Sequence, residues 1–188
     1  MDDLEGFEAA AAWAEPIFAA VQHADLDAPS INDGWTVRVL TAHIIHGTHM
    51  FARGLRGVDV SNDAPKNNVT PFDEANIAGA YRAAIADVRA AAAEDGNLDR
   101  IVSLPIGPTP GTIVMGVGAN ELALHGWDLA SSIGMDVTIP DDLASWLEEK
   151  NRPTAPRMVE FGVYAPEVDV PEDASPHSRL LALTGRSG

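Results

Sequence analysis

The chain has 188 residues, of which 28 are acidic and 12 basic, so its formal net charge is -16, and it contains no cysteine. This charge argues against nucleic acid and against an anionic membrane surface, because both are bound by clustered Lys and Arg. The lack of cysteine excludes disulfides, thiolate ligands and a nucleophilic thiol, so His, Asp or Glu must hold any metal.

The length suits one domain, or one domain with a small appendage, and a hydrophobic fraction of 46% can supply a substantial core. No apolar run approaches the roughly 18 residues of a membrane span. The segment 1–5 is acidic where a secretory signal would be basic. We therefore expect a soluble, cytoplasmic protein.

The first half of the chain predicts two helices. Apolar residues at three- and four-residue spacing indicate a helix from residue 3 to about 24, with Pro16 expected to kink or split it. The segment 25–34 is a polar connector. A second helix is predicted from Thr36, a favourable N-cap residue, to about Leu55.

A third helix is expected to open at Thr70, with Thr70 as N-cap, Pro71 at the first helical position and Asp73 in the capping-box place. The Ala-rich run that follows has high helix propensity to about Glu94. Gly96 is expected to end this helix.

The segment 101–105 is short and indicates an extended conformation, and 107–111 contains two prolines and is predicted not to be helical. A fourth helix is predicted from Thr112 or Ile113 to residue 133, ended by Gly134.

Beyond the fourth helix the chain is rich in proline. A short helix is predicted from Pro140 to about Lys150, followed by a loop-rich flap that ends in one short helix over residues 176–183. The fold class is therefore all-α, an up-and-down four-helix bundle with a small loop-rich C-terminal extension. We expect residues 1–134 to form the metal-binding bundle and residues 135–188 to pack on it.

The most informative stretch is Glu-Leu-Ala-Leu-His-Gly-Trp-Asp at residues 121–128. Glu121 and His125 stand four residues apart in a predicted helix and so share one face. His43, on the second predicted helix, can complete a three-ligand metal site. Three protein ligands leave one coordination position open, as in catalytic rather than structural zinc sites.

Other candidates flank these ligands. His46 is a candidate auxiliary acid or base, whereas His49 is expected at the surface. Asp128 either orients the ligand histidine that precedes it or serves as a cap or a surface salt bridge. Trp35 and Trp127 either pack in the core or form a cofactor-binding wall of the metal cavity.

Two blocks of sequence carry a resemblance to a known family. They are Gly-Trp-Thr-Val-Arg at 34–38 with Ala-His at 42–43, and the stretch 121–130. Together they resemble the mycothiol-dependent maleylpyruvate isomerase N-terminal domain and its actinobacterial metal-binding relatives, within the DinB-like superfamily. The stretch 161–186 resembles the closing segment of an uncharacterised branch of that group.

The resemblance implies a DinB-like four-helix bundle and a divalent metal, usually zinc, held by His43, Glu121 and His125. Two features depart from the family pattern. His46 stands where small residues are common, so the cavity is expected to differ in polarity or ligand number. The larger C-terminal domain of the isomerase is absent or reduced to 135–188, so the metal site carries over but the isomerase substrate does not.

The leading hypothesis is a divalent-metal-dependent enzyme that uses a small mycothiol-like thiol for transfer or isomerisation, because a cation can generate a nucleophile from a bound thiol or water. Zinc is expected, although the same ligands suit nickel, iron or manganese. The alternatives are a metal-hydroxide hydrolase, a non-catalytic metal- or ligand-binding bundle, and a structural bundle with a buried Glu–His pair. The expected partner is a small-molecule substrate, and a homodimer is left open.

Overall fold

The computed structural model describes residues 1–63 and 71–187. The chain divides into two compact units, one of residues 2–137 and one of residues 138–188 together with Met1. The predicted packing of the C-terminal extension on the bundle remains a prediction.

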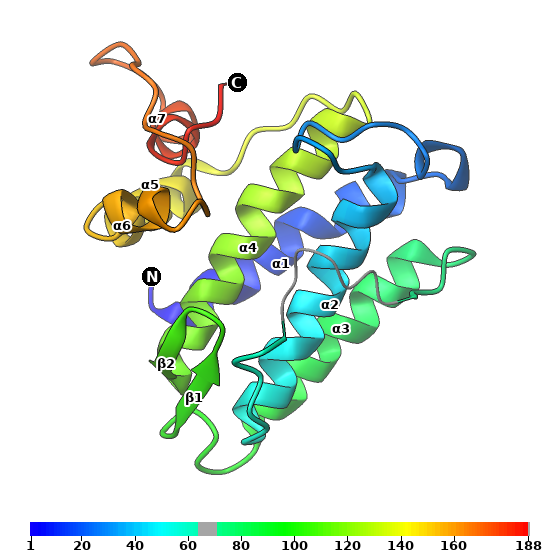
Figure 1. The fold of residues 1–188 in the computed structure, drawn as a ribbon, viewed down its shortest axis with the longest axis vertical. Helices are drawn as coiled ribbons and strands as arrows, with labels where there is room; N and C mark the ends of the chain where they lie inside the picture. The colour runs from blue at the N-terminus through cyan, green and yellow to red at the C-terminus, as the bar shows by residue number, and fades with distance from the viewer. Residues whose placement is uncertain (64–70, 188) are drawn as a thin grey trace. The chain divides into compact units, whose positions relative to one another are not determined.

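The first unit is a bundle of long helices with one small hairpin (Figure 1). Its elements are α1 (Asp3–Ala20), a 3-10 turn η1 (His23–Asp25), α2 (Val37–Leu55), α3 (Ile77–Ala93), the strands β1 (Ile101–Leu104) and β2 (Gly107–Pro110), and α4 (Gly111–Ser132). Helix α1 packs on α3 and α4, and so does α2. The predicted all-α four-helix bundle is confirmed.

Side-chain contacts give the directions of the helices. Arg38 pairs with Glu74 near the start of α3, and Arg56, after the end of α2, pairs with Glu94 after the end of α3, so α2 and α3 run parallel. Helix α1 runs against α3, since Arg82 pairs with Glu15 whereas Arg89, further along α3, pairs with Glu8, nearer the start of α1. The bundle therefore runs up, down, down and up from α1 to α4 (Figure 1), so the four helices are as predicted but the alternating directions of an up-and-down bundle fail between α2 and α3.

Most predicted helix ends agree with the structure. The Thr36 hydroxyl accepts from the backbone N–H of Val39, so Thr36 is the N-cap of α2 as predicted. Helix α1 ends at Ala20 rather than near residue 24, and it continues through Pro16 as one helix. Gly134 follows α4 with a φ of 72°, which suits the predicted glycine stop.

The predicted start of the third helix is wrong. Thr70 lies outside the described residues, and 71–76 is not helical. Asp73 accepts from the N–H of Ala75 with its side chain and from that of Asn76 with its carbonyl, which closes a turn instead of a capping box. The helix begins after this turn, where the Asn76 side chain accepts from the N–H of Gly79.

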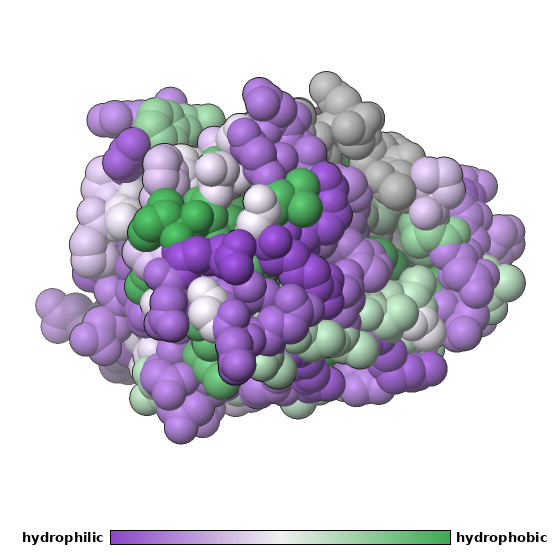
Figure 2. Space-filling model, turned by 90° about the horizontal axis from the view of Figure 1, so that it is seen from below, coloured by the Kyte–Doolittle hydropathy of each residue, from purple (hydrophilic) through white to green (hydrophobic). Residues whose placement is uncertain are grey.

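The sequence predicted the first strand of the hairpin but not the second. Residues 101–104 are extended, as expected, and they pair antiparallel with 107–110. Gly111 is already helical, so the predicted non-helical segment 107–111 is one residue too long. Apolar side chains stay exposed at this end of the bundle, namely Ile101, Ile106 and Ile113. Figure 2 shows hydrophilic residues over most of the face seen from below, with apolar residues in separate patches.

The second unit contains α5 (Asp141–Asn151), α6 (Ala155–Glu160) and α7 (Pro176–Leu183). Helices α5 and α7 match the two predicted short helices, and α6 was not predicted. Buried leucines and the Glu148 carboxylate, which accepts from Arg179 at 2.9 Å, join α5 to α7. No helix among the residues described is long and apolar enough to cross a membrane.

Candidate metal centre

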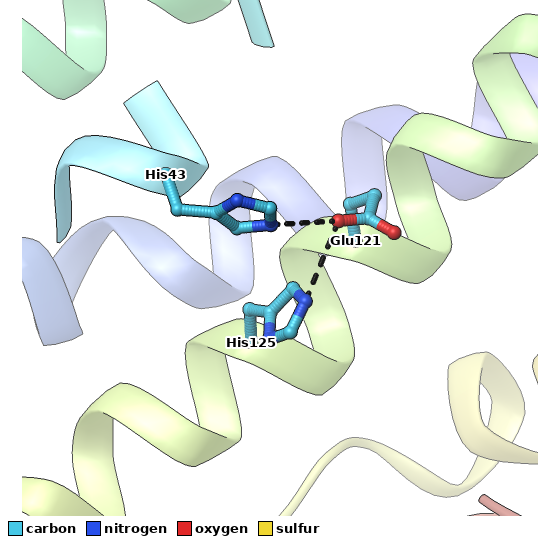
Figure 3. A group of neighbouring side chains, drawn as sticks. All are labelled: His43, Glu121 and His125. Atoms are coloured by element: carbon cyan, nitrogen blue, oxygen red, sulfur yellow. Dashed lines mark ion pairs between the residues drawn. The ribbon is translucent and has the colours of Figure 1, made fainter. Parts of the chain in front are cut away.

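Three predicted ligand side chains converge between α2 and α4 (Figure 3). His43 comes from α2, and Glu121 and His125 come from consecutive turns of α4. Each histidine Nε2 lies 3.5 Å from the Oε2 of Glu121. The three candidate ligand atoms all lie within 4.8 Å of one another.

These separations suit a shared cation better than direct hydrogen bonds. Zinc bonds to nitrogen and oxygen of about 2.1 Å place tetrahedral ligand atoms about 3.4 Å apart. The observed 3.5 Å between Nε2 and Oε2 matches that spacing. It is also longer than the roughly 2.7–3.2 Å of an ordinary N–H···O bond. The donor set therefore fits a divalent metal, and the alternative of a simple buried Glu121–His125 pair is poorly supported.

The other ring nitrogen of His125 faces a buried carboxylate. Its Nδ1 lies 2.8 Å from the Oδ2 of Asp128, and the Asp128 side chain is only 1% exposed. A carboxylate accepts hydrogen bonds, so Nδ1 carries a proton, and Nε2 is the nitrogen left to bind a metal. This is the tautomer that a metal ligand requires.

His43 is held differently. Its side chain is 10% exposed, and its Nδ1 is buried without a hydrogen-bond partner among the described residues. The ring packs against Trp35, with centroids 5.0 Å apart, and edge-on against His125 at 4.9 Å. Packing rather than a hydrogen bond therefore orients this imidazole.

Trp35 lies beside both histidines, since its ring centroid is also 6.5 Å from that of His125. Trp127, unlike the partly buried Trp35, is buried. It follows His125 by two residues, which turns it about 200° around the helix from that ring. A cofactor-binding role for either tryptophan stays a prediction.

His46 is half-buried one turn after His43. Burial is the main cause that lowers its pKa from the ordinary value of 6.5. His49 points elsewhere, since its Nδ1 lies 2.8 Å from the Oδ2 of Asp87 on α3 and its side chain is 41% exposed. The surface position expected for His49 is thus observed.

Helix α2 leaves open space one turn after the proposed ligand His43. A Cβ placed on Gly47, four residues after His43, would meet no atom of the described residues within 4 Å. Glu121 on α4 keeps 33% of its side chain exposed. The carboxylate of the centre is therefore partly open to solvent.

The hydrogen bond between Asn32 and Asp128 was not predicted from the sequence. Its side-chain N–H donates to the Oδ2 of Asp128 at 3.1 Å, although 96 positions separate the two residues. The only local signal is its place in the polar turn before Trp35.

Comparison with known proteins agrees with this fold. The family model described as the mycothiol maleylpyruvate isomerase N-terminal domain matches residues 7–130. Two uncharacterised proteins of Mycobacterium tuberculosis are similar over the whole chain, MT0763 of strain CDC 1551 / Oshkosh and Rv0738 of strain ATCC 25618 / H37Rv. Each is 25% identical over 189 residues, covering 100% of this chain and 99% of the relative.

Two solved structures share the fold. A crystal structure of the mycothiol-dependent maleylpyruvate isomerase matches with a TM-score of 0.64 and 17% identity, covering 81% of this chain and 71% of that one. A histidine-to-alanine mutant of that isomerase matches with a TM-score of 0.62 and 15% identity, covering 80% and 68%. The family match spans most of the chain and includes all three residues of the candidate centre, so the chain belongs to the mycothiol maleylpyruvate isomerase N-terminal domain family.

Proposed function

We propose that this protein is a divalent-metal-dependent enzyme that activates a small thiol for transfer to, or isomerisation of, a small-molecule substrate. The observation that carries the proposal is the approach of His43 Nε2, Glu121 Oε2 and His125 Nε2 to within 4.8 Å of one another. Exposure of Glu121 on one side supports access for an incoming ligand.

Two imidazoles and one carboxylate suit zinc, and they also suit nickel, iron or manganese. With three protein ligands a coordination position stays open. A cation held there would lower the pKa of a coordinated thiol or water and so supply a nucleophile near neutral pH.

The chain's composition favours a thiol that arrives with the cosubstrate. It contains no cysteine, so the protein cannot provide the sulfur itself. The solved structures that share its fold are named as mycothiol-dependent isomerases. A mycothiol-like thiol is therefore the proposed cosubstrate, and an electrophilic small molecule is the proposed substrate.

The remaining residues have roles that follow from their surroundings. Asp128 holds the proton of His125 on Nδ1, which keeps Nε2 free to bind. His46 has a lowered pKa and is neutral at pH 7, so it can accept a proton from the reacting group. Trp35 packs edge-on against the His43 ring and lies beside the His125 ring, so it can form one wall of the centre.

Metal analysis of the purified protein tests the site. We expect about one divalent ion per wild-type chain and little in His43→Ala and Glu121→Ala, because loss of one of three ligands weakens binding. His49→Ala is the matched control, since it removes a histidine of α2 that pairs with Asp87 instead. Equal metal content in all four proteins would end the proposal.

Thiol dependence tests the chemistry. The metal-loaded protein should convert an electrophilic substrate with mycothiol present and should not do so without it. A turnover rate that is the same with and without the thiol would indicate hydrolysis by metal-bound hydroxide. A raised melting temperature with metal but no turnover under either condition would indicate a binding protein.

A further inference from the structure

The loop before α2 reaches across to the end of α4 and contacts the carboxylate behind His125. The side-chain N–H of Asn32 donates to Oδ2 of Asp128 at 3.1 Å. The same Oδ2 accepts from His125 Nδ1 at 2.8 Å. Two donors from separate segments thus converge on one buried oxygen, and the orientation of the carboxylate is set by both.

The Asn32 amide is itself held in one orientation. The Ser30 hydroxyl donates to its Oδ1 at 3.0 Å and accepts from its backbone N–H at 2.9 Å. With Oδ1 occupied by a donor, the amide nitrogen is the atom left to face Asp128. The Asn32 amide therefore acts as a hydrogen-bond donor to the Asp128 carboxylate.

A second contact fixes the same loop to α4. The backbone N–H of Ile31 donates to the Ser132 hydroxyl at 3.0 Å, and that hydroxyl donates to the Asp128 carbonyl at 2.7 Å. The N–H of Trp35 closes the loop by donating to the carbonyl of Asn32 at 3.0 Å. One short loop thus supports Asp128 and carries the tryptophan that lies beside the histidines.

We infer that Asn32 is a positioning residue for the metal centre, acting on His125 through Asp128. The inference rests on the proposed function, in which His125 is a ligand. A buried carboxylate that loses a donor is less well satisfied and freer to turn. It then holds the imidazole less firmly in the ligand tautomer, and metal affinity falls. A carboxylate placed like Asp128 typically contributes about 10–100-fold to metal affinity, and Asn32 supports part of that contribution.

Titration of the full-length protein with Co²⁺, followed by its visible absorption spectrum, tests the inference. Asn32→Ala should weaken Co²⁺ binding by up to about 10-fold, the lower end of the effect of losing a ligand's direct partner. Asn32→Asp keeps the size of the side chain but puts an acceptor against the Asp128 carboxylate, so it should weaken binding at least as much. A role limited to filling space would leave this isosteric variant like the wild type.

Asp33→Ala is the matched control, since it changes the next residue of the loop, which is exposed, and it should bind Co²⁺ like the wild type. Melting in the presence of a chelator shows whether each variant folds. If Asn32→Asp folds and binds Co²⁺ within twofold of the wild type with the same spectrum, the inference is wrong. If the wild type itself binds no Co²⁺, the proposed function fails and the inference falls with it.

Discussion

His46 differs from the proposed ligands in its electrostatic surroundings. Burial lowers its pKa below 6.5, Asp63 opposes this, and the positive charge of Arg53 adds to the lowering. A cation at the neighbouring centre would act in the same direction as this positive charge. His46 is therefore kept neutral and ready to accept a proton at pH 7.

This lowered pKa predicts a pH dependence of stability. The unfolded chain binds the His46 proton at pH values near 6.5, where the folded chain does not yet bind it. The free energy of unfolding should therefore fall as the pH drops through 6.5 and level off below the lower pKa of the folded state. His46→Asn should make this fall shallower in urea unfolding measured at steps from about pH 8 to about pH 5. An unchanged slope would contradict the burial of His46.

Sequence spacing was enough to select the three side chains that meet. Glu121 and His125 follow from the four-residue repeat of a helix, and His43 is the inward histidine of α2. Asn32 could not be found in this way, since its contact with Asp128 joins residues far apart in the chain through an irregular loop. The spacing of residues in the sequence predicts which side chains share a helix face, but it does not predict the position of an irregular loop.

At the scale of elements, helix ends followed local chemistry where one signal dominated. Thr36 caps α2, since its hydroxyl accepts from the N–H of Val39 while the nearby Ser30 and Asn32 side chains are engaged elsewhere. Near α3 the signals at Thr70, Asp73 and Asn76 competed, and Asn76 caps the helix because Asp73 is engaged in a turn. The hairpin strand 107–110 carries two prolines, so pairing with β1, not propensity, makes it a strand.

Two glycines of α2 predict opposite effects of one substitution. A Cβ on Gly47 would meet no described atom within 4 Å, whereas one on Gly54 would lie 2.6 Å from Cγ1 of Val102 on β1. Gly47→Ala should raise the free energy of unfolding by about 0.5–1 kcal/mol, since glycine inside a helix is unfavourable. Gly54→Ala should lower it by about 1–3 kcal/mol, because buried Val102 must move.

Urea unfolding of the two variants beside the wild type checks this pair. Both changes add one methyl group to the same helix, so helix propensity cancels in their difference. A stabilising Gly54→Ala would show that the hairpin does not pack tightly on α2.

At the scale of the whole molecule, the sequence predicted the number of bundle helices, but the alternating directions of an up-and-down bundle are wrong for α2 and α3, which run parallel. Helices of 17–22 residues are about 26–33 Å long. The connection 56–76 can span more than that when extended. Connection length therefore allowed α3 to run either way along α2, and side-chain pairing between Arg38 and Glu74 reveals the direction.

Charge also acts at this scale. The excess of 16 negative charges favours approach of cations over anions. In the described part of the bundle, Arg38, Arg53, Arg56 and Arg89 each pair with a carboxylate. The field around the bundle is thus suited to gathering a divalent metal and poorly suited to gathering phosphates.

Diffraction from crystals of the zinc-loaded protein at the zinc absorption edge tests the central claim most directly. The account predicts one anomalous peak about 2.0–2.2 Å from His43 Nε2, a Glu121 carboxylate oxygen and His125 Nε2. A crystal whose only zinc peaks lie elsewhere, with these three side chains bonded to one another instead, would contradict it.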